Sequence, residues 1–121
     1  MEERRRFVRL AARLPLVYLV LPSGGKQHAT TKDIGGGGIS FYADKVLRPG
    51  THLQMALTLP GGEEPVHCTA EVVSSVQYAT AGKGTSRRSV DVDVRFLEIA
   101  PKDQEALMEY VARHLQTPSG A

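Results

Sequence analysis

Five arginines crowd into the first 13 residues, and they are the side chains of this sequence best suited to hold a charged ligand: Arg4, Arg5, Arg6, Arg9 and Arg13. With two glutamates they give this segment a formal charge of +3, whereas the other 10 basic and 11 acidic residues contribute −1 to the total of +2. Guanidinium groups bind phosphate oxygens in pairs and stack on purine faces, which lysine does less well. A solubilising arm is the alternative interpretation. Because Arg5 and Arg9 are four residues apart, directly before a strand-forming segment, their spacing favours an arm held against the domain.

An aspartate followed by a run of glycines forms the second candidate. Asp33 is separated by one isoleucine from the four glycines at positions 35 to 38. The N–H groups of glycines are unshielded by side chains and suit a phosphate, and a carboxylate can accept hydrogen bonds from a base edge. A flexible turn between two strands would explain the glycines alone equally well. The preceding aspartate favours a binding site.

The sequence lacks the motifs of catalytic and metal sites. It has no Gly-Xaa-Ser-Xaa-Gly elbow, no phosphate-binding loop ending in Lys-Ser/Thr, and no His-Xaa-Xaa-Xaa-His or Cys-Xaa-Xaa-Cys pair. Asp91 and Asp93 share one strand face, about 7 Å apart, and are interpreted as a solvated face rather than a catalytic pair. His67 and Cys68 point to opposite faces of a strand, which argues against a shared metal. We therefore expect no enzyme, no catalytic residue, no metal and no cofactor.

Alternating apolar residues predict a mainly β fold. Strands are expected over residues 14–21, 27–32, from 39, 53–59, 66–72 and 90–96, and glycines 35–38 are not expected in the interior of a strand. Residues 101–116 have helical periodicity, with an apolar face made by Leu107, Tyr110, Val111, His114 and Leu115. These elements predict a six-stranded antiparallel β-barrel with one C-terminal amphipathic helix over an open end or edge. The expected organisation is a basic N-terminal arm (1–13), the barrel with its helix (14–116) and a loose tail (117–121).

Two further features bear on the surroundings of the chain. The single cysteine excludes an intramolecular disulfide framework and fits a reducing compartment, so we expect a cytoplasmic protein. No apolar run approaches the roughly 18 to 20 residues that a membrane span needs. Nucleic-acid binding is disfavoured, because a short arm of charge +3 makes few phosphate contacts and no exposed aromatic platform is evident.

Both candidate segments resemble the motifs of one family. The segment Arg4-Arg5-Arg6-Phe7-Val8-Arg9 resembles the RRxxxR motif, and the segment from Asp33 to Gly38 resembles the [D/N]xSxxG motif, of PilZ domains, bacterial receptors for cyclic di-GMP. The resemblance continues through the segments Arg48-Pro49-Gly50-Thr51 and Val92-Asp93-Val94-Arg95-Phe96, and it covers about residues 4 to 112.

The resemblance implies a PilZ-type barrel whose arm folds over a dinucleotide on the barrel surface. It assigns phosphate binding and guanine stacking to Arg5 and Arg9, and a hydrogen bond from a guanine edge to Asp33. Arg4, as an additional arginine, implies about two stacked ligands per chain. Gly38 would keep the backbone close to the ligand.

The departure from the family pattern is Gly35, which stands where the family has serine. The missing hydroxyl removes a hydrogen bond worth about 0.5 to 1.5 kcal/mol, or roughly threefold to tenfold in affinity. We therefore expect serine at this position to tighten binding.

The function implied is that of a single-domain, cyclic di-GMP-binding sensor or adaptor that signals through a protein partner. Motility, secretion and exopolysaccharide control are the processes that the resemblance suggests. The alternative is a PilZ-like adaptor that has lost the ligand and works only by protein–protein interaction.

Overall fold

The computed structural model describes residues 8–82 and 85–115, with the side chains of all but 79–88. Six antiparallel strands close into a barrel in the order β3-β2-β5-β6-β7-β4, and pairing between β3 and β4 completes the circle. They are β2 (Pro15–Val20), β3 (Gln27–Gly35), β4 (Gly38–Ala43), β5 (His52–Leu57), β6 (Val66–Gly82) and β7 (Thr85–Ile99). The predicted six-stranded barrel is confirmed.

The barrel interior is filled by the apolar residue of each alternating pair. Side chains that are almost completely buried come from all six strands and include Leu16, Ile34, Ile39, Phe41, Leu53, Met55, Leu57, Val72, Val90, Val92 and Val94. The rings of Tyr18 and Phe41 pack with their centroids 5.0 Å apart. Since successive side chains of a strand point to opposite faces, the intervening polar residues line the outside of the barrel.

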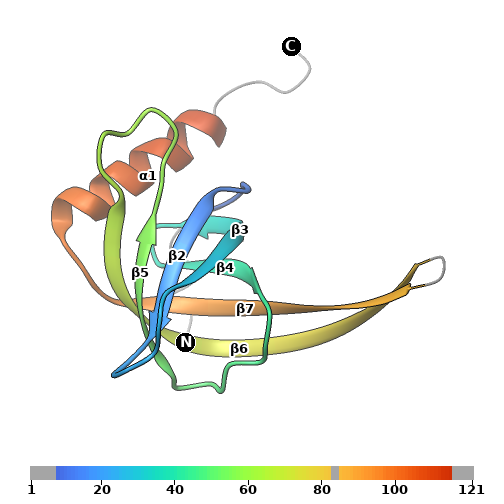
Figure 1. The fold of residues 1–121 in the computed structure, drawn as a ribbon. Coiled ribbons are helices and arrows are strands. Elements are labelled where there is room, and N and C mark those ends of the chain that lie inside the picture. Colours follow the sequence, from blue (N-terminus) through green and yellow to red (C-terminus); the bar gives the residue numbers. More distant parts are fainter. Residues whose placement is uncertain (1–7, 83–84, 116–121) are drawn as a thin grey trace, which may run out of the picture.

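Two strand bounds differ from those expected. The second strand continues past residue 32 to Gly35, and β4 begins at Gly38, so the glycines lie at strand ends and in the turn between them, and none is inside a strand. The last two strands are also longer than their apolar alternation indicates, because β6 and β7 pair with each other as far as Gly82 and Thr85. Beyond the reach of β5 and β4 they continue as a twisted two-stranded ribbon (Figure 1). Such a ribbon needs no buried face, so its sequence lacks the apolar period that predicts a barrel strand.

The helix α1 (Pro101–Leu115) follows β7 and lies across one end of the barrel (Figure 1). Leu107 and Val111 are its buried residues, and Tyr110 packs against the core from a half-buried position. His114 and Leu115, expected on the apolar face, are exposed. The helix therefore covers the barrel end through a narrower stripe than its periodicity predicted. No helix in the described part of the chain is long and apolar enough to span a membrane.

Candidate functional site

The end of the basic arm is a strand of the sheet. Residues Arg9–Ala11 form β1, which pairs antiparallel with the end of β3 and places Arg9 opposite Gly35. Thr31, which is completely buried, ties the segment after β1 to β3. Its hydroxyl donates to the carbonyl of Ala12 and accepts a hydrogen bond of 2.9 Å from the N–H of Leu14. The position of Arg9 on the barrel is thus set by backbone pairing and by a buried hydroxyl.

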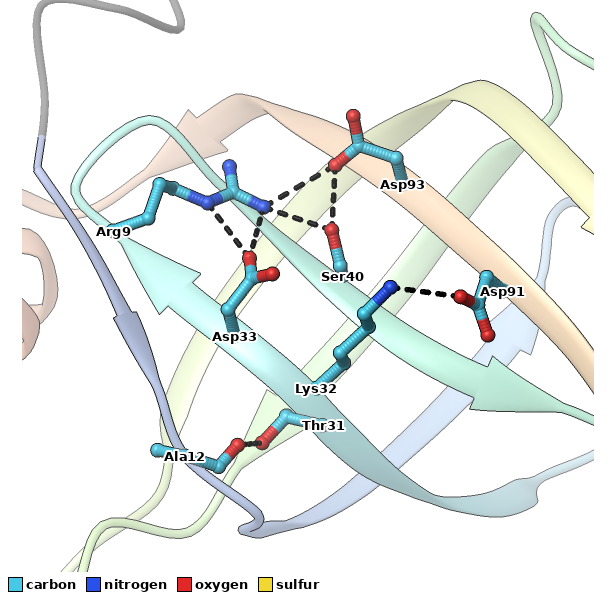
Figure 2. Close-up of polar contacts among 8 residues, drawn as sticks. All are labelled: Arg9, Ala12, Thr31, Lys32, Asp33, Ser40, Asp91 and Asp93. Atoms are coloured by element: carbon cyan, nitrogen blue, oxygen red, sulfur yellow. Dashed lines mark hydrogen bonds and ion pairs between the residues drawn. The ribbon is translucent and has the colours of Figure 1, made fainter.

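Three polar side chains form a row across neighbouring strands, and Arg9 reaches into this row (Figure 2). Asp33 of β3 stands opposite Ser40 of β4, which stands opposite Asp93 of β7. The Nε and Nη2 atoms of Arg9 donate to Oδ1 of Asp33 at 2.8 and 2.6 Å. Nη2 also lies 2.9 Å from the Ser40 hydroxyl and 3.3 Å from Oδ1 of Asp93. The Ser40 hydroxyl donates to the same Asp93 oxygen at 2.9 Å.

This cluster is half-buried on the outer surface of the barrel. The side chains of Arg9, Asp33 and Asp93 are 26%, 27% and 21% exposed. Charged groups at this depth keep contact with water, so a ligand can reach them without the barrel opening. One guanidinium and two carboxylates give the cluster a formal charge of −1.

Gly35 leaves the space through which Arg9 reaches Asp33. A Cβ atom at Gly35 would lie 2.8 Å from the carbonyl oxygen of Val8 and 2.9 Å from Cδ of Arg9. Both distances are below those of real Cβ contacts, and the first is to backbone that cannot swing away. The serine that was expected to tighten binding would meet these contacts, because its Cβ atom occupies the same place. In this chain the glycine at the position of the family serine allows β1 and its arginine to lie close against β3.

Gly38 is required by an even closer approach. A Cβ atom there would lie 2.2 Å from the carbonyl oxygen of Val94 in β7. Gly38 therefore allows the close pairing of β4 with β7, which is one of the strand pairs of the barrel. Close approach of backbone to a ligand, the role expected for Gly38, stays a prediction.

The strand face that carries Asp91 and Asp93 lies on the outside of the barrel, as its alternation predicts, but cations cover part of it. Lys32 lies at a β-bulge of β3, where the register shifts, and its ammonium group contacts Asp91 at 2.8 Å. The hydrogen bond and the charge of Asp91 raise the pKa of Lys32 above its ordinary value. Asp91 is 17% exposed. Both carboxylates thus pair with cations of strands that do not adjoin β7, Asp91 with Lys32 of β3 and Asp93 with Arg9 of β1.

The other residues named from the sequence are the arginines of the arm and the single cysteine. Arg4 and Arg5 lie outside the described residues, so their roles stay predictions. Arg13 is on the barrel, with its guanidinium carbon 5.4 Å from the centroid of the Tyr42 ring. Cys68 is buried, and burial raises the pKa of its thiol to about 12. Among the described residues no group of three or more His, Cys, Asp or Glu side chains could hold a metal ion.

Ser40 and Asp93 belong to the cluster but were not predicted as site residues. Strand alternation alone places both on the outer face, because Ile39 and Phe41 flank Ser40 and Val92 and Val94 flank Asp93. What alternation cannot supply is the register that puts β3, β4 and β7 side by side with these three residues in one row.

Comparison with known proteins gives this architecture a family. The model of the PilZ domain family matches residues 3–113. None of the curated proteins matches the sequence. Among solved structures, the PilZ domain of YcgR from Escherichia coli with c-di-GMP is 19% identical, with a TM-score of 0.70 and coverage of 93% of this chain and 95% of that one.

Two further solved structures have the same fold within longer chains. Bacillus subtilis inhibitor of motility, MotI/DgrA, is 22% identical with a TM-score of 0.72. The K. pneumonia MrkH–c-di-GMP complex is 15% identical with a TM-score of 0.74. Each comparison covers 93% of this chain, which spans about half the length of those chains, 52% and 53%. At these identities the likeness concerns the fold.

A small closed β-barrel with one helix across its end, and with the arginine-bearing strand β1 paired to the end of β3, is the fold that these solved structures share. Since the family model matches nearly the whole chain, the protein belongs to the PilZ domain family.

Proposed function

We propose that this protein is a receptor for cyclic di-GMP and that a partner protein reads its ligand-bound state. The observation that carries the proposal is the placement of Arg9 on Asp33, across the strand end that holds the glycine turn. This contact joins the two segments whose residues resemble the family's ligand-binding motifs. Two of the solved structures with this fold, the PilZ domain of YcgR and MrkH, are complexes with c-di-GMP.

The roles proposed for individual residues follow the order of the arm. Arg5 and Arg9 bind phosphate oxygens and stack on guanine, Asp33 accepts hydrogen bonds from a guanine edge, and Arg4 supplies a further cation. Gly35 gives the space in which β1 approaches β3, and Gly38 gives the space in which β4 approaches β7, both beneath the proposed ligand. In the proposed function the protein binds and releases the ligand unchanged, so no residue has a catalytic role.

The helix offers a route from the ligand to a partner. The side-chain amide of Gln104 in α1 donates a hydrogen bond of 2.8 Å to the carbonyl of Gly36 in the turn between β3 and β4. A ligand seated on this turn therefore acts on a backbone group that α1 also holds. Met108 and Leu115, 42% and 45% exposed, lie farther along the same helix and are apolar surface for a partner to bind.

Titration calorimetry with cyclic di-GMP tests the receptor. The natural chain should release or absorb heat, and Arg9→Ala should bind much more weakly. Arg48→Ala is the matched control, because Arg48 is an exposed arginine beside a turn and does not belong to the cluster of Arg9 and its partners. Equal affinities for the two variants would contradict the site.

Hydrogen exchange tests the route to the partner. Ligand should change the exchange of backbone amides in α1, and this change should be lost in Gln104→Ala while affinity stays within about twofold. If ligand binding leaves the amide exchange of α1 unchanged in the natural chain, the route through Gln104 is contradicted.

One observation favours a second function, a ligand-independent adaptor. Arg9 is already engaged by two carboxylates and a hydroxyl, which is how a purely structural arginine looks. Absence of any heat or chemical-shift change at high micromolar cyclic di-GMP would leave this function in place of the receptor.

A further inference from the structure

Asp93 competes for the guanidinium that the proposed ligand needs. Its Oδ1 lies 3.3 Å from Nη2 of Arg9, the longest of the four contacts that Arg9 makes with the row. The same oxygen accepts the Ser40 hydroxyl at 2.9 Å, which keeps the carboxylate pointed at Arg9. Asp93 comes from β7, on the side of the cluster away from β1 and β3 (Figure 2).

The Nη2 atom of Arg9 has more acceptors within reach than it has N–H groups to donate. It carries two N–H groups, yet three acceptors lie within hydrogen-bond distance of it, one each from Asp33, Ser40 and Asp93. A phosphate that takes two parallel hydrogen bonds from Arg9 has to displace one of them, or use Nη1 under the repulsion of two carboxylates. Asp33 holds both Nε and Nη2 at short distances, whereas Asp93 holds Nη2 alone. We therefore expect ligand phosphate to displace the contact between Arg9 and Asp93 before the contacts between Arg9 and Asp33.

We propose that Asp93 is an affinity-determining residue of this site, acting as an internal anion that competes with ligand phosphate for Arg9. The inference rests on the proposed function in that cyclic di-GMP is the ligand. Asp93 acts through Arg9 and is not itself a ligand contact. Its carboxylate weakens binding and sets the ligand concentration at which Arg9 becomes engaged by ligand phosphate.

Asp93→Asn is the informative variant, because asparagine keeps the size of the side chain and an acceptor oxygen for Ser40 while removing the charge. We expect cyclic di-GMP to bind about threefold to thirtyfold more tightly, the effect of one unit charge about 4 to 5 Å from a phosphate in a largely solvated site. Affinity in this variant should also depend more steeply on salt, since one repulsive charge is gone.

Asp91→Asn is the matched control. Asp91 lies on the same strand and face, two residues away, and the substitution makes the same change in net charge, but its partner is Lys32 rather than Arg9. Its affinity for cyclic di-GMP should stay within about twofold of the natural chain. Thermal unfolding of both variants verifies that the fold is intact.

A second probe separates this inference from the proposed function. Inorganic pyrophosphate offers phosphate oxygens without guanines, and the chemical shift of the Arg9 side-chain Nε–H reports its approach. Pyrophosphate should shift this signal at lower concentration in Asp93→Asn than in the natural chain.

The outcomes are distinct. Tighter binding of both probes by Asp93→Asn alone supports the inference. Equal gains in Asp93→Asn and Asp91→Asn, or unchanged or weaker binding in a folded Asp93→Asn, overturn it. If no variant binds cyclic di-GMP while pyrophosphate still distinguishes Asp93→Asn, the proposed function fails and the inference stands. If neither probe binds any variant, both fail.

Discussion

The glycine at the start of β4 makes a sharp test of why the motif has glycine there. In Gly38→Ala the new Cβ atom would lie 2.2 Å from the carbonyl oxygen of Val94 and 3.2 Å from Cα of Arg95. Real Cβ contacts below 3.0 Å essentially do not occur, so β4 and β7 must separate by at least about 0.8 Å. This seam runs from Gly38 to Ala43 and is one of the pairings that close the barrel, so the strain cannot be relieved at a free edge.

The expected cost follows from that geometry. Overpacking of a closed interior costs about 1 to 3 kcal/mol, and a backbone oxygen yields less than a side chain, so we expect Gly38→Ala to lower the free energy of unfolding by about 2 to 4 kcal/mol. At roughly 4 °C per kcal/mol the melting temperature should fall by about 8 to 16 °C.

Alanine substitutions at two other glycines should cost less stability than Gly38→Ala. At Gly25 a Cβ atom would meet nothing within 4 Å, so Gly25→Ala should leave stability unchanged or raise it by up to about 1 kcal/mol. At Gly35 the closest atoms are at 2.8 and 2.9 Å, and one belongs to the Arg9 side chain, so Gly35→Ala should cost about 1 to 2 kcal/mol. The predicted loss of stability on substitution by alanine is therefore largest at Gly38, smaller at Gly35 and absent at Gly25.

Urea unfolding followed by circular dichroism measures all three variants, with the midpoint and the slope fitted separately. Loss of stability should appear in the midpoint. If Gly38→Ala unfolds at the same urea concentration as Gly25→Ala, the close approach of β4 and β7 is wrong. Weak ligand binding by a fully stable Gly38→Ala would instead place the motif glycine in direct contact with the ligand.

Further predictions concern the arm, the turn and the buried thiol. Arg5→Ala and Arg9→Ala should each weaken cyclic di-GMP binding by about 1.5 to 3 kcal/mol, measured by calorimetry at fixed salt; losses below tenfold would remove that arginine from the phosphate contacts. A titration well above the dissociation constant should give about two ligands per natural chain and fewer for Arg4→Ala, whereas a value near one for both would exclude Arg4. Gly35→Ser should lower affinity rather than raise it, because the side chain pushes Arg9 away from its place on β3; tighter binding by a folded variant would contradict this. Burial raises the pKa of Cys68 to about 12 from 9.0, so iodoacetamide at pH 8 should label the thiol only after unfolding. The stability that this group contributes is present below pH 9 and is lost as pH rises towards 12, because the unfolded thiol ionises first; a pH-independent unfolding midpoint over that window would contradict the assignment.

The sequence determined the barrel, because its evidence is local. Alternation around Met55, Cys68 and Val92 requires one face of each strand to be buried, and six such strands with turn residues between them have few ways to bury those faces other than closure. The helix was predictable for the same reason, from its period and its flanking proline. The ribbon formed by the far ends of β6 and β7 was not, since Val76, Gln77 and Tyr78 at its start are exposed and a two-stranded ribbon needs no apolar period.

The candidate site divides in the same way. Arg9 and Asp33 could be named from the sequence, because their residue types carry the chemistry and each stands in a recognisable motif. Their contact could not, because it depends on β1 pairing with β3 in the one register that sets Arg9 opposite Gly35. Ser40 and Asp93 have no motif of their own. They join the cluster only because β3, β4 and β7 place them in one row, and a shift of one residue in any of these strands would turn their side chains to the other face of the sheet. Residue types determine which groups can bind an anion, whereas the register of the closed barrel decides which of them share it.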